Sequence, residues 1–403
     1  MNKKEVKRAP VLRFKGFTND WEQRKLGDIS EIIRGASPRP ISDPKWFNSN
    51  SNIGWLRISD VTAQHGRIQH LSQHISILGQ AKTRVISTPH LLLSIAASVG
   101  YPVINYVKTG VHDGFLIFEN PKFNIDFGFY WLAFYKHEWQ KFGQPGSQVN
   151  LNSSIVKKTN IGLPDNVEQK AIVHLLKLID NCITLQQRKL KLLRTLKSGL
   201  SFKLFNKKHL NNLSQISLDQ IGQTYSGLTG KSKKDFGHGH AFYVSYLNVN
   251  QNEIGNPKQI DRIEIDKKQN LVQKNDIFFT ISSETPEEVG LTSLWPVSCK
   301  NLYLNSFCFG FRINTKMFIP LYLGYLFRSE YFREKVLPLA QGISRYNLSK
   351  NNVLKIKIGQ EEIAIQEKYA KVMNDLDSDI LRQKKKVKEL KLCKKFLLQN
   401  MFI

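Results

Sequence analysis

The sequence predicts an α+β protein in which two copies of a mixed α/β domain are separated by two long helices that form an antiparallel coiled coil. The first observation behind this fold class is a heptad pattern of apolar residues over 165–205. The second is the return of that pattern 197 positions later, near the end of the chain. The third is a weaker similarity between the segments that precede the two patterns. Together they indicate an internal duplication of roughly 200-residue units.

The first long helix is expected over the stretch from Asp165 to Phe205, which contains no proline. Asp165 follows Pro164 and stands where a helix N-cap is expected. At 1.5 Å per residue such a helix spans about 60 Å. Its core candidates recur at alternating spacings of three and four, which is typical of a coiled-coil seam. The seam residues are Leu176, Ile179, Ile183, Gln186, Leu190, Leu193, Lys197, Leu200 and Leu204.

The second long helix repeats this seam, including its two polar positions. Gln383 and Lys394 stand where Gln186 and Lys197 stand in the first copy. Two unrelated surface helices would each carry an apolar stripe, but a stripe alone would not repeat its own polar breaks. The second seam consists of Met373, Leu376, Ile380, Gln383, Val387, Leu390, Lys394, Leu397 and Met401.

The segments before the helices are rich in turn-forming residues between short apolar runs. In the first copy, strands are predicted at 54–61, 91–95, 102–107 and 114–118, followed by a helix over 127–142. In the second copy, 218–227 resembles 26–35, 243–249 resembles 55–61, and 276–283 resembles 90–98. We therefore expect a first domain over 14–163, a first helix over 164–205, a polar connector over 206–217, a second domain over 218–358 and a second helix over 359–403.

The length of the connector predicts the direction of the second helix. Twelve residues reach about 40 Å when fully extended, which is less than the length of the first helix. The second domain is therefore expected near the end of the first helix, so that the second helix runs back antiparallel to it. This arrangement places the two domains at opposite ends of the helix pair.

Composition limits the class of protein. Hydrophobic residues make up 41% of the chain and charged residues 23%, as in soluble globular proteins. No apolar run is long enough to cross a bilayer, and the N-terminal segment lacks the apolar core of a signal peptide. The four cysteines form no CxxC pair and are expected to be reduced thiols. These features favour a cytoplasmic protein.

The formal net charge of +26 fits a solvated basic surface with no partner, but such a field more often serves to bind a polyanion. The candidates are nucleic acid and an anionic membrane surface. Membrane binding needs a basic amphipathic helix with a side that faces lipid. Here the apolar stripes of both long helices are expected to face each other, which favours nucleic acid and no membrane.

The sequence contains no recognisable catalytic constellation. Gly230-Lys231-Ser232 resembles the end of a phosphate-binding loop, but that motif needs a glycine at position 225, where Tyr225 stands. A histidine cluster at His65, His70 and His74 has no nearby acidic or cysteine partner, so a metal site is not expected. We therefore expect a binding protein with no cofactor or metal of its own.

Basic, amide and hydroxyl residues gather in loops at corresponding places in the two copies. Arginine, asparagine and glutamine can read base edges, whereas serine, threonine and lysine mostly hold phosphates. Each residue alone also fits an ordinary solvated loop; the repeated grouping is what favours DNA binding. The candidates of the first copy are Arg34, Ser37, Arg39, Lys45, Arg57, Ser59, Arg67, Gln144, Ser147 and Gln148. Those of the second copy are Ser226, Lys231, Ser232, Lys233, Lys234, Tyr243, Ser245, Asn248, Gln341, Ser344 and Arg345.

The whole chain resembles the specificity (S) subunits of type I restriction–modification systems. The resemblance is carried by the opening LRFKGFTNDWEQRKLGDI (12–29), by the repeated plan of domain and long helix, and by the junction at 150–172. Within that junction Pro164, Glu168 and Gln169 match the family's segment. The second copy departs from it, because Gly359 stands near the expected proline and Ile365-Gln366 replaces Glu-Gln.

The resemblance implies that each domain is a target recognition domain that reads one half of a split, asymmetric double-stranded DNA site. It implies that the helices fix the gap between the halves and that the chain does no chemistry. Two methyltransferase subunits would bind S-adenosylmethionine and flip out an adenine, while a separate translocase subunit would use ATP and Mg and cut the DNA. A stand-alone architectural DNA- or RNA-binding protein with a coiled-coil spacer remains the alternative.

Overall fold

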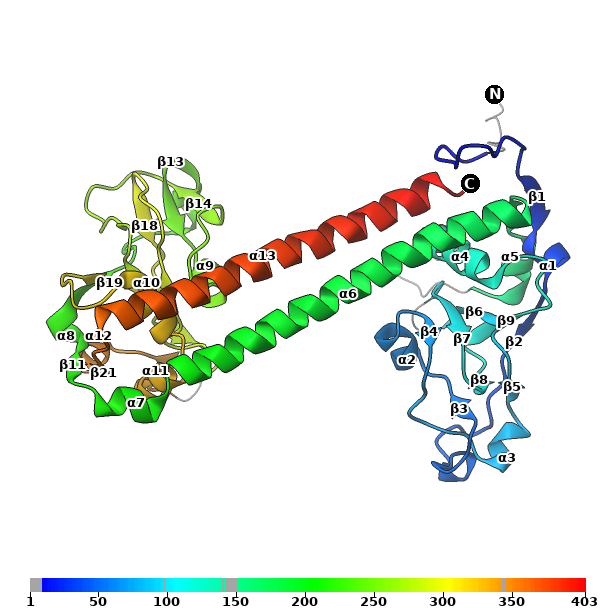
Figure 1. Ribbon diagram of the computed structural model, residues 1–403, viewed down its shortest axis with the longest axis horizontal. Helices are drawn as coiled ribbons and strands as arrows, with labels where there is room; N and C mark the ends of the chain where they lie inside the picture. Colours follow the sequence, from blue (N-terminus) through cyan, green and yellow to red (C-terminus); the bar gives the residue numbers. More distant parts are fainter. Residues whose placement is uncertain (1–8, 97–98, 140, 142–150, 343–344) are drawn as a thin grey trace. The chain divides into compact units, whose positions relative to one another are not determined.

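The computed structural model describes residues 9–96, 99–139, 141, 151–342 and 345–403. Contacts divide the chain into two units, which we describe separately. Unit 1 comprises Met1–Gln187 and Lys385–Ile403, and unit 2 comprises Arg188–Lys384. Each unit therefore contains one α/β domain and part of both long helices. Figure 1 shows the long helix α6 in green and the long helix α13 in orange to red.

Unit 1 is built mainly on a five-stranded sheet of order β2-β9-β6-β7-β4, beside a smaller sheet of order β3-β8-β5. A third pairing, between β1 and β10, closes the domain just before α6 begins. The elements of the domain are β1 (Glu22–Lys25), α1 (Leu26–Ile29), β2 (Glu31–Arg34), η1 (Pro44–Trp46), β3 (Gly54–Trp55), α2 (Ile58–Ala63), β4 (Arg67–Ile68), α3 (Ile77–Gln80), β5 (Arg84–Ile86), β6 (Leu91–Ser94), β7 (Pro102–Asn105), β8 (Thr109–Val111), β9 (Phe115–Glu119), α4 (Ile125–Trp139), α5 (Ser153–Lys158) and β10 (Asn160–Leu163).

Unit 2 repeats this plan with a four-stranded sheet of order β12-β19-β15-β17 and a smaller sheet of order β14-β13-β18. Its elements are α7 (Lys207–Asn212), β11 (Gln215–Ser217), α8 (Leu218–Ile221), β12 (Gly222–Ser226), η3 (Lys233–Asp235), β13 (Phe236–Val244), α9 (Tyr246–Gln251), β14 (Ile260–Ile263), β15 (Ile277–Thr280), β16 (Ser282–Ser283), β17 (Thr292–Leu294), β18 (Leu302–Leu304), β19 (Cys308–Ile313), α10 (Pro320–Leu326), α11 (Glu330–Val336), η4 (Leu337–Leu339), β20 (Tyr346–Asn347), α12 (Lys350–Leu354) and β21 (Lys357–Gly359).

The main sheets of the two units have the same strand order where they correspond, which confirms the duplicated α/β plan. In both, a short helix (α1 or α8) leads into the first edge strand, and that strand pairs antiparallel with β9 or β19. The smaller sheets differ more. β3 has two residues and β13 has nine, although each pairs parallel with its neighbour β8 or β18.

The two long helices begin at equivalent positions. Helix α6 spans Asn166–Leu204 and α13 spans Ile363–Asn400, so their first residues are 197 positions apart. The Asp165 carboxylate accepts hydrogen bonds from the backbone N–H groups of Val167 and Glu168 at 2.9 and 2.8 Å, as predicted for an N-cap. All eighteen predicted seam residues are buried or half-buried.

Contacts within each unit show that the helices pair antiparallel, as predicted. In unit 1, residues near the start of α6, such as Leu176, share a core with Leu397 and Met401 at the end of α13. In unit 2, Phe205, which follows α6, lies 5.6 Å from the ring of Tyr322 and 6.3 Å from that of Tyr369 near the start of α13. The start of one helix therefore lies beside the end of the other in both units.

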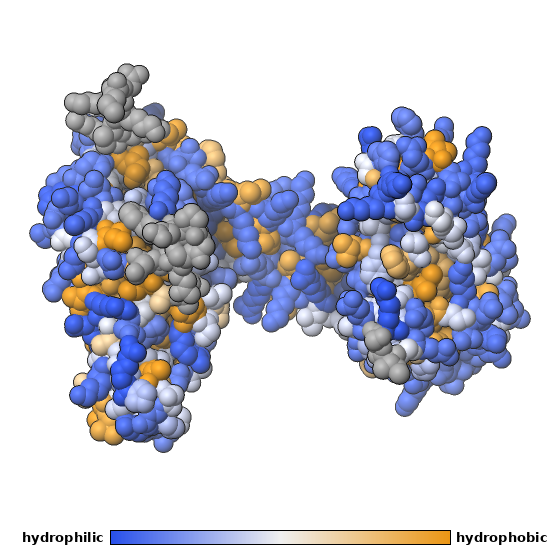
Figure 2. Space-filling model, turned by 180° about the vertical axis from the view of Figure 1, so that it is seen from behind, coloured by the Kyte–Doolittle hydropathy of each residue, from blue (hydrophilic) through white to orange (hydrophobic). Residues whose placement is uncertain are grey.

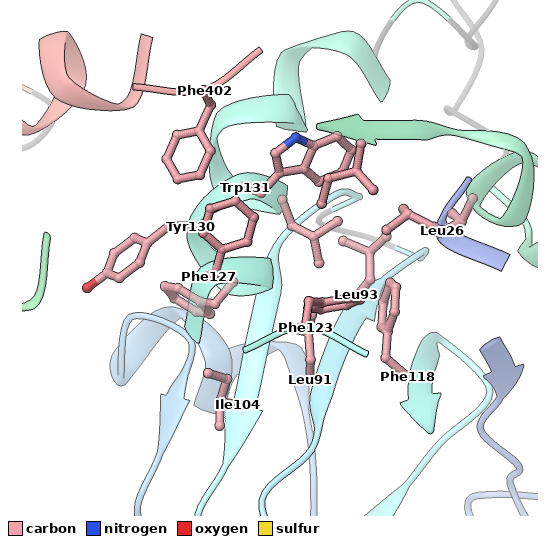
Figure 3. Close-up of a cluster of buried hydrophobic side chains, with 14 of the residues drawn as sticks. Leu26, Leu91, Leu93, Ile104, Phe118, Phe123, Phe127, Tyr130, Trp131 and Phe402 are labelled. Atoms are coloured by element: carbon pink, nitrogen blue, oxygen red, sulfur yellow. The ribbon is translucent and has the colours of Figure 1, made fainter. Parts of the chain in front are cut away.

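Aromatic side chains of α4 and of the end of the chain pack together in the core of unit 1. Figure 3 shows Phe127, Tyr130 and Trp131 of α4 gathered above the sheet residues Leu91 and Leu93, with Phe402 from the end of the chain beside them. The ring of Phe402 lies 5.4 Å from that of Phe127 and 6.5 Å from that of Trp21. This packing attaches the end of α13 to the first domain.

One predicted strand is wrong in part. The run 54–61 forms a strand only at Gly54–Trp55, and α2 then begins at Ile58. The Asp60 carboxylate accepts the backbone N–H of Arg57 at 3.0 Å, an N-terminal capping interaction that favours a helix over a continued strand. The segment 206–217 is also folded, since Leu210 of α7 is fully buried and β11 pairs with β21.

Candidate nucleic-acid interface

In each unit one end of the main sheet carries loops that hold several of the predicted binding residues. We call it the loop end: the edge where β2 ends and β9 begins in unit 1, and where β12 ends and β19 begins in unit 2. Equivalent backbone hydrogen bonds close it, from Ile95 to Gly114 at 2.8 Å and from Ile281 to Phe307 at 2.9 Å. The two loop ends can therefore be compared position by position.

Asp113 is the centre of the loop end of unit 1. The Arg34 side chain donates to the Asp113 backbone carbonyl at 2.6 Å, the Ser37 hydroxyl donates to its carboxylate at 2.7 Å, and the Arg39 guanidinium pairs with that carboxylate at 2.6 Å. Partial burial raises the pKa of Asp113, but the Ser37 hydrogen bond and the two arginine charges outweigh it and leave the pKa below its ordinary value. The structure thus brings three predicted residues together around an anion that keeps its charge.

Lys45, Arg57 and Ser59 lie elsewhere on the surface of unit 1. The Lys45 ammonium pairs with Asp43 at 2.7 Å and lies 4.5 Å from the Trp46 ring centroid. The Arg57 guanidinium pairs with Asp60 at 3.2 Å, and its hydrogen bond to that carboxylate raises the pKa of Arg57. Ser59 is exposed on α2.

Arg67 occupies an interior position. Its guanidinium pairs with Asp126 and donates to the Tyr106 hydroxyl, both at 2.7 Å, and lies 4.5 Å from the Phe129 ring centroid. Burial opposes its charge, but the hydrogen bond to Asp126 and the neighbouring tyrosines keep the pKa of Arg67 above its ordinary value. These contacts join β4 to α4, and the structure does not bring Arg67 to the Asp113 group.

The loop end of unit 2 presents an exposed aromatic residue, Phe307, at the position that Gly114 holds in unit 1. The Phe307 side chain is 52% exposed, and the Arg345 guanidinium lies 5.9 Å from its ring centroid. Lys350 donates to the Ser226 hydroxyl at 2.5 Å, and exposed Gln341 pairs with Asn347 through its backbone. An exposed ring beside a guanidinium is a surface on which a base can stack.

The loop after β12 carries a short run of lysines in different settings. The Lys231 ammonium pairs with Asp266 at 2.8 Å, and this hydrogen bond contributes most to lowering the pKa of Asp266. Ser232 caps η3 through Asp235. Lys233 and Lys234 are exposed. Of the three lysines, Lys233 and Lys234 present the more accessible charges.

Three further predicted residues of unit 2, Tyr243, Ser245 and Asn248, make mainly structural contacts. Asn248 is fully buried, and its amide donates to the backbone carbonyls of Asn256 and Gln259 at 2.9 and 2.7 Å. Ser245 caps α9, and the half-buried Tyr243 ring lies 5.0 Å from that of Phe236. These contacts hold the smaller sheet and α9 together. Gln144, Ser147, Gln148 and Ser344 lie outside the described residues.

Sequence reasoning did not single out Asp113, Phe307 and Lys350. Asp113 and Phe307 occupy the short turns that lead into β9 and β19, and Lys350 begins α12. The predicted strand at 114–118 was a signal for Asp113. A residue just before this strand lies at the same end of the sheet as the loop after its antiparallel neighbour β2. No comparable signal marked Phe307.

Within the described part of the chain, no group of three or more His, Cys, Asp or Glu residues is placed to hold a metal ion. No helix among those residues is long and apolar enough to cross a membrane. Figure 2 shows a largely hydrophilic face on both units, with apolar surface also visible on the helices.

These features define a duplicated protein with two α/β domains on a coiled coil and with different polar loops at corresponding sheet ends. Residues 18–195 match the family model described as the type I restriction modification DNA specificity domain. Residues 18–195 therefore carry a specificity domain of this family, and the chain as a whole is similar to type I restriction–modification specificity subunits.

Individual relatives are distant in sequence. A Methanocaldococcus jannaschii protein, provisionally named the type I restriction enzyme MjaX specificity subunit, is 26% identical over 202 residues. That match spans 47% of this chain and 46% of the relative, so the chain matches about half the length of this curated protein.

Two solved structures share the fold along nearly the whole chain. The S subunit of the type I restriction-modification system of M. genitalium has a TM-score of 0.60 at 16% identity, with 98% of this chain and 99% of that chain covered. A chain from a structure on complex assembly and conformational transition of the type I R-M system has a TM-score of 0.56 at 13% identity, with 94% and 96% covered.

Proposed function

We propose that this chain is the DNA-sequence-recognition subunit of a type I restriction–modification complex. In this proposal it reads a bipartite, asymmetric duplex site, one half with each domain. It also positions methyltransferase subunits, two in number, and restriction/translocase subunits. The chain acts in the cytoplasm and performs no chemistry itself; S-adenosylmethionine, ATP and Mg belong to the partner subunits.

The observation that carries this proposal is the contrast between the two loop ends. The main sheets share one strand order, yet unit 1 presents Arg34, Ser37 and Arg39 around Asp113, whereas unit 2 presents Arg345 beside Phe307. Different side chains on one scaffold suit two different half-sites. The repeated helices suit partners that dock in the same way on each copy.

The test is methylation sequencing of DNA from cells that co-express the chain with its cognate methyltransferase subunit. Methyladenine confined to one split motif is the expected result, and exchange of residues 14–163 for those of another specificity subunit should change one half of that motif only. A complex that forms without a split motif would contradict the proposal. Absence of a complex would favour the stand-alone DNA- or RNA-binding alternative.

Replacing Arg345 by alanine is expected to weaken binding to the cognate duplex by about 1–3 kcal/mol, the usual discrimination of one base contact. Arg34→Ala should act similarly on the other half-site. The measurement is fluorescence anisotropy with the cognate duplex and with a scrambled duplex.

The control is Arg382→Ala, which removes one charge from an exposed side chain of α13. It should change both affinities little. If Arg345→Ala weakens cognate and scrambled duplexes equally, Arg345 holds a phosphate and its assignment as a base reader is wrong.

A further inference from the structure

The two lysines of the coiled-coil seam each take part in a three-residue linkage. In unit 1, the Lys394 ammonium of α13 pairs with Asp180 of α6 at 2.5 Å. The Tyr130 hydroxyl of α4 donates to the other oxygen of Asp180 at 2.8 Å, and Lys394 lies 5.5 Å from the Tyr130 ring centroid. One carboxylate therefore joins both helices and the first domain.

Unit 2 contains the same linkage, but there α6 supplies the lysine and α13 supplies the aspartate. The Lys197 ammonium of α6 pairs with Asp377 of α13 at 2.6 Å and lies 5.5 Å from the Tyr325 ring centroid. The Tyr325 hydroxyl of α10 donates to Asp377 at 3.0 Å. Lys197 also pairs with Glu253 of the second domain at 2.5 Å. Asp377 and Lys394 are each 197 positions from Asp180 and Lys197, so the duplication preserved both ionic partners.

The tyrosine is the rigid part of each linkage. The Tyr130 side chain is fully buried and that of Tyr325 is 1% exposed. Figure 3 shows the Tyr130 ring at the edge of the core cluster with its hydroxyl directed away from the labelled residues. Burial, followed by the charge of the partner aspartate, raises the pKa of both tyrosines, so each hydroxyl stays protonated and donates.

A coiled coil alone does not require this arrangement. A lysine and an aspartate are sufficient to satisfy a polar break in a helical seam, and leucine at these positions would pack more apolar surface. The tyrosines add a directed hydrogen bond from the domain to the same carboxylate. Their presence in both units, on the corresponding helices α4 and α10, indicates that the link between domain and helix pair was retained along with the seam.

We propose that Tyr130–Asp180–Lys394 and Tyr325–Asp377–Lys197 are positioning linkages that fix the orientation of each recognition domain on the helix pair. They thereby restrict the DNA gap between the two half-sites to one length. This inference rests on the proposed function. The six residues contact no DNA in this scheme; they act through the domains that they orient.

The required accuracy follows from the geometry of B-DNA. One turn of about 10–10.5 base pairs rises about 34–36 Å, so one additional base pair moves a half-site by about 3.4 Å and rotates it by about 35°. A domain that can rotate on its helices by that amount would accept gaps of neighbouring length. The linkages would restrict that rotation within each unit.

The test uses the full chain in complex with its methyltransferase subunits. The variant Tyr130→Phe/Tyr325→Phe removes only the two hydroxyls and leaves both rings in the cores. The matched control, Tyr135→Phe/Tyr322→Phe, removes hydroxyls from the same helices. The Tyr135 ring stacks on Trp131 at 4.7 Å, and the Tyr322 hydroxyl is buried without a hydrogen-bond partner among the described residues.

Methylation sequencing should show a wild-type complex that modifies one gap length. In the linkage variant, modification of sites one base pair longer or shorter should rise about tenfold relative to the original gap, since a hydrogen bond to a charged group typically contributes at least that factor. The control variant should retain wild-type gap selectivity. Thermal unfolding of each chain reports any loss of folding.

Unchanged gap selectivity in the linkage variant, with a split motif present in the wild type, would overturn this inference and leave the proposed function intact. Equal loss of methylation at every gap, with a lowered unfolding temperature, would also overturn it, because the linkages would then serve stability only. A wild-type complex without any split motif would reject the proposed function, and this inference with it.

Discussion

Replacing Arg312 by methionine is expected to lower the free energy of unfolding by about 3–5 kcal/mol, because it leaves a buried carboxylate without its cation. Asp276 is 1% exposed and pairs with Arg312 of β19 at 2.8 Å. It also accepts the Tyr225 hydroxyl and the Gln273 backbone N–H, each at 2.7 Å. This network crosses β12, β19 and the start of β15, so its loss affects the main sheet of unit 2. Urea denaturation measures the change.

Asp276→Ala should be less destabilising than Arg312→Met. The Arg312 side chain is 28% exposed and also donates to the Leu271 carbonyl, so it can rehydrate when its partner is removed. The exposed Arg262 of β14 gives the control, and Arg262→Met should stay within about 0.5 kcal/mol of wild type. If Arg312→Met also stays within that range, the pair is a solvated surface interaction and this account of the sheet is wrong.

The sequence predicted the fold best where local signals and long-range packing agree. Asp165 caps α6 as expected, and every predicted seam residue is at least half-buried. Matching of the two copies also related 55–61 to 243–249 correctly, since both segments run from a strand into a short helix. The prediction of a strand over the whole of 54–61 was wrong in part, because the Asp60 carboxylate caps a helix that begins at Ile58.

Contacts between residues far apart in the chain could not be predicted. Glu168, one of the residues that carried the family resemblance, is 1% exposed. Its carboxylate accepts hydrogen bonds from the Arg13 guanidinium at 2.7 Å and from the Trp21 indole N–H at 3.2 Å. Gln169 accepts the backbone N–H of Asn124 at 2.9 Å. No periodicity relates these partners.

The second copy explains which part of that motif is general. Gln366 occupies the place of Gln169 and accepts the backbone N–H of Ile319 at 2.8 Å, just before α10. Ile365 replaces Glu168, and a different acid, Glu361, pairs with His209 at 2.6 Å. In both copies the glutamine therefore connects the long helix to the loop before α4 or α10. The acidic contact, by contrast, uses a different acid and a different partner in the second copy.

Loop position and residue type predicted candidates for DNA binding, but they did not indicate how each side chain is packed. Loop residues were selected by type, and type does not separate an exposed base reader from a buried cap. Asn248 and Arg67 are committed to interior contacts, while Arg39 and Arg345 remain exposed. Burial depends on tertiary packing, which composition and spacing do not encode.

Affinity for duplex DNA is expected to fall by about 10³- to 10⁵-fold between about 50 and 200 mM monovalent salt, the range for a protein that contacts six to ten phosphates. The net charge of +26 supplies the cations for such contacts. A plot of the logarithm of the association constant against that of salt concentration, from anisotropy titrations, gives the number of phosphates neutralised. A slope near zero would contradict a polyanionic partner altogether.

The exposed lysines after β12 are expected to contribute part of this salt dependence. Lys233→Gln/Lys234→Gln removes two exposed charges and should reduce the slope by about two, equally for cognate and scrambled duplexes. Lys231→Gln is the matched control, because its ammonium is already paired with Asp266 and only 14% of its side chain is exposed. If Lys231→Gln reduces the slope as much as the double variant, Lys231 leaves Asp266 to contact the phosphates. If neither variant changes it, this loop lies outside the DNA interface and the charge acts from elsewhere on the surface.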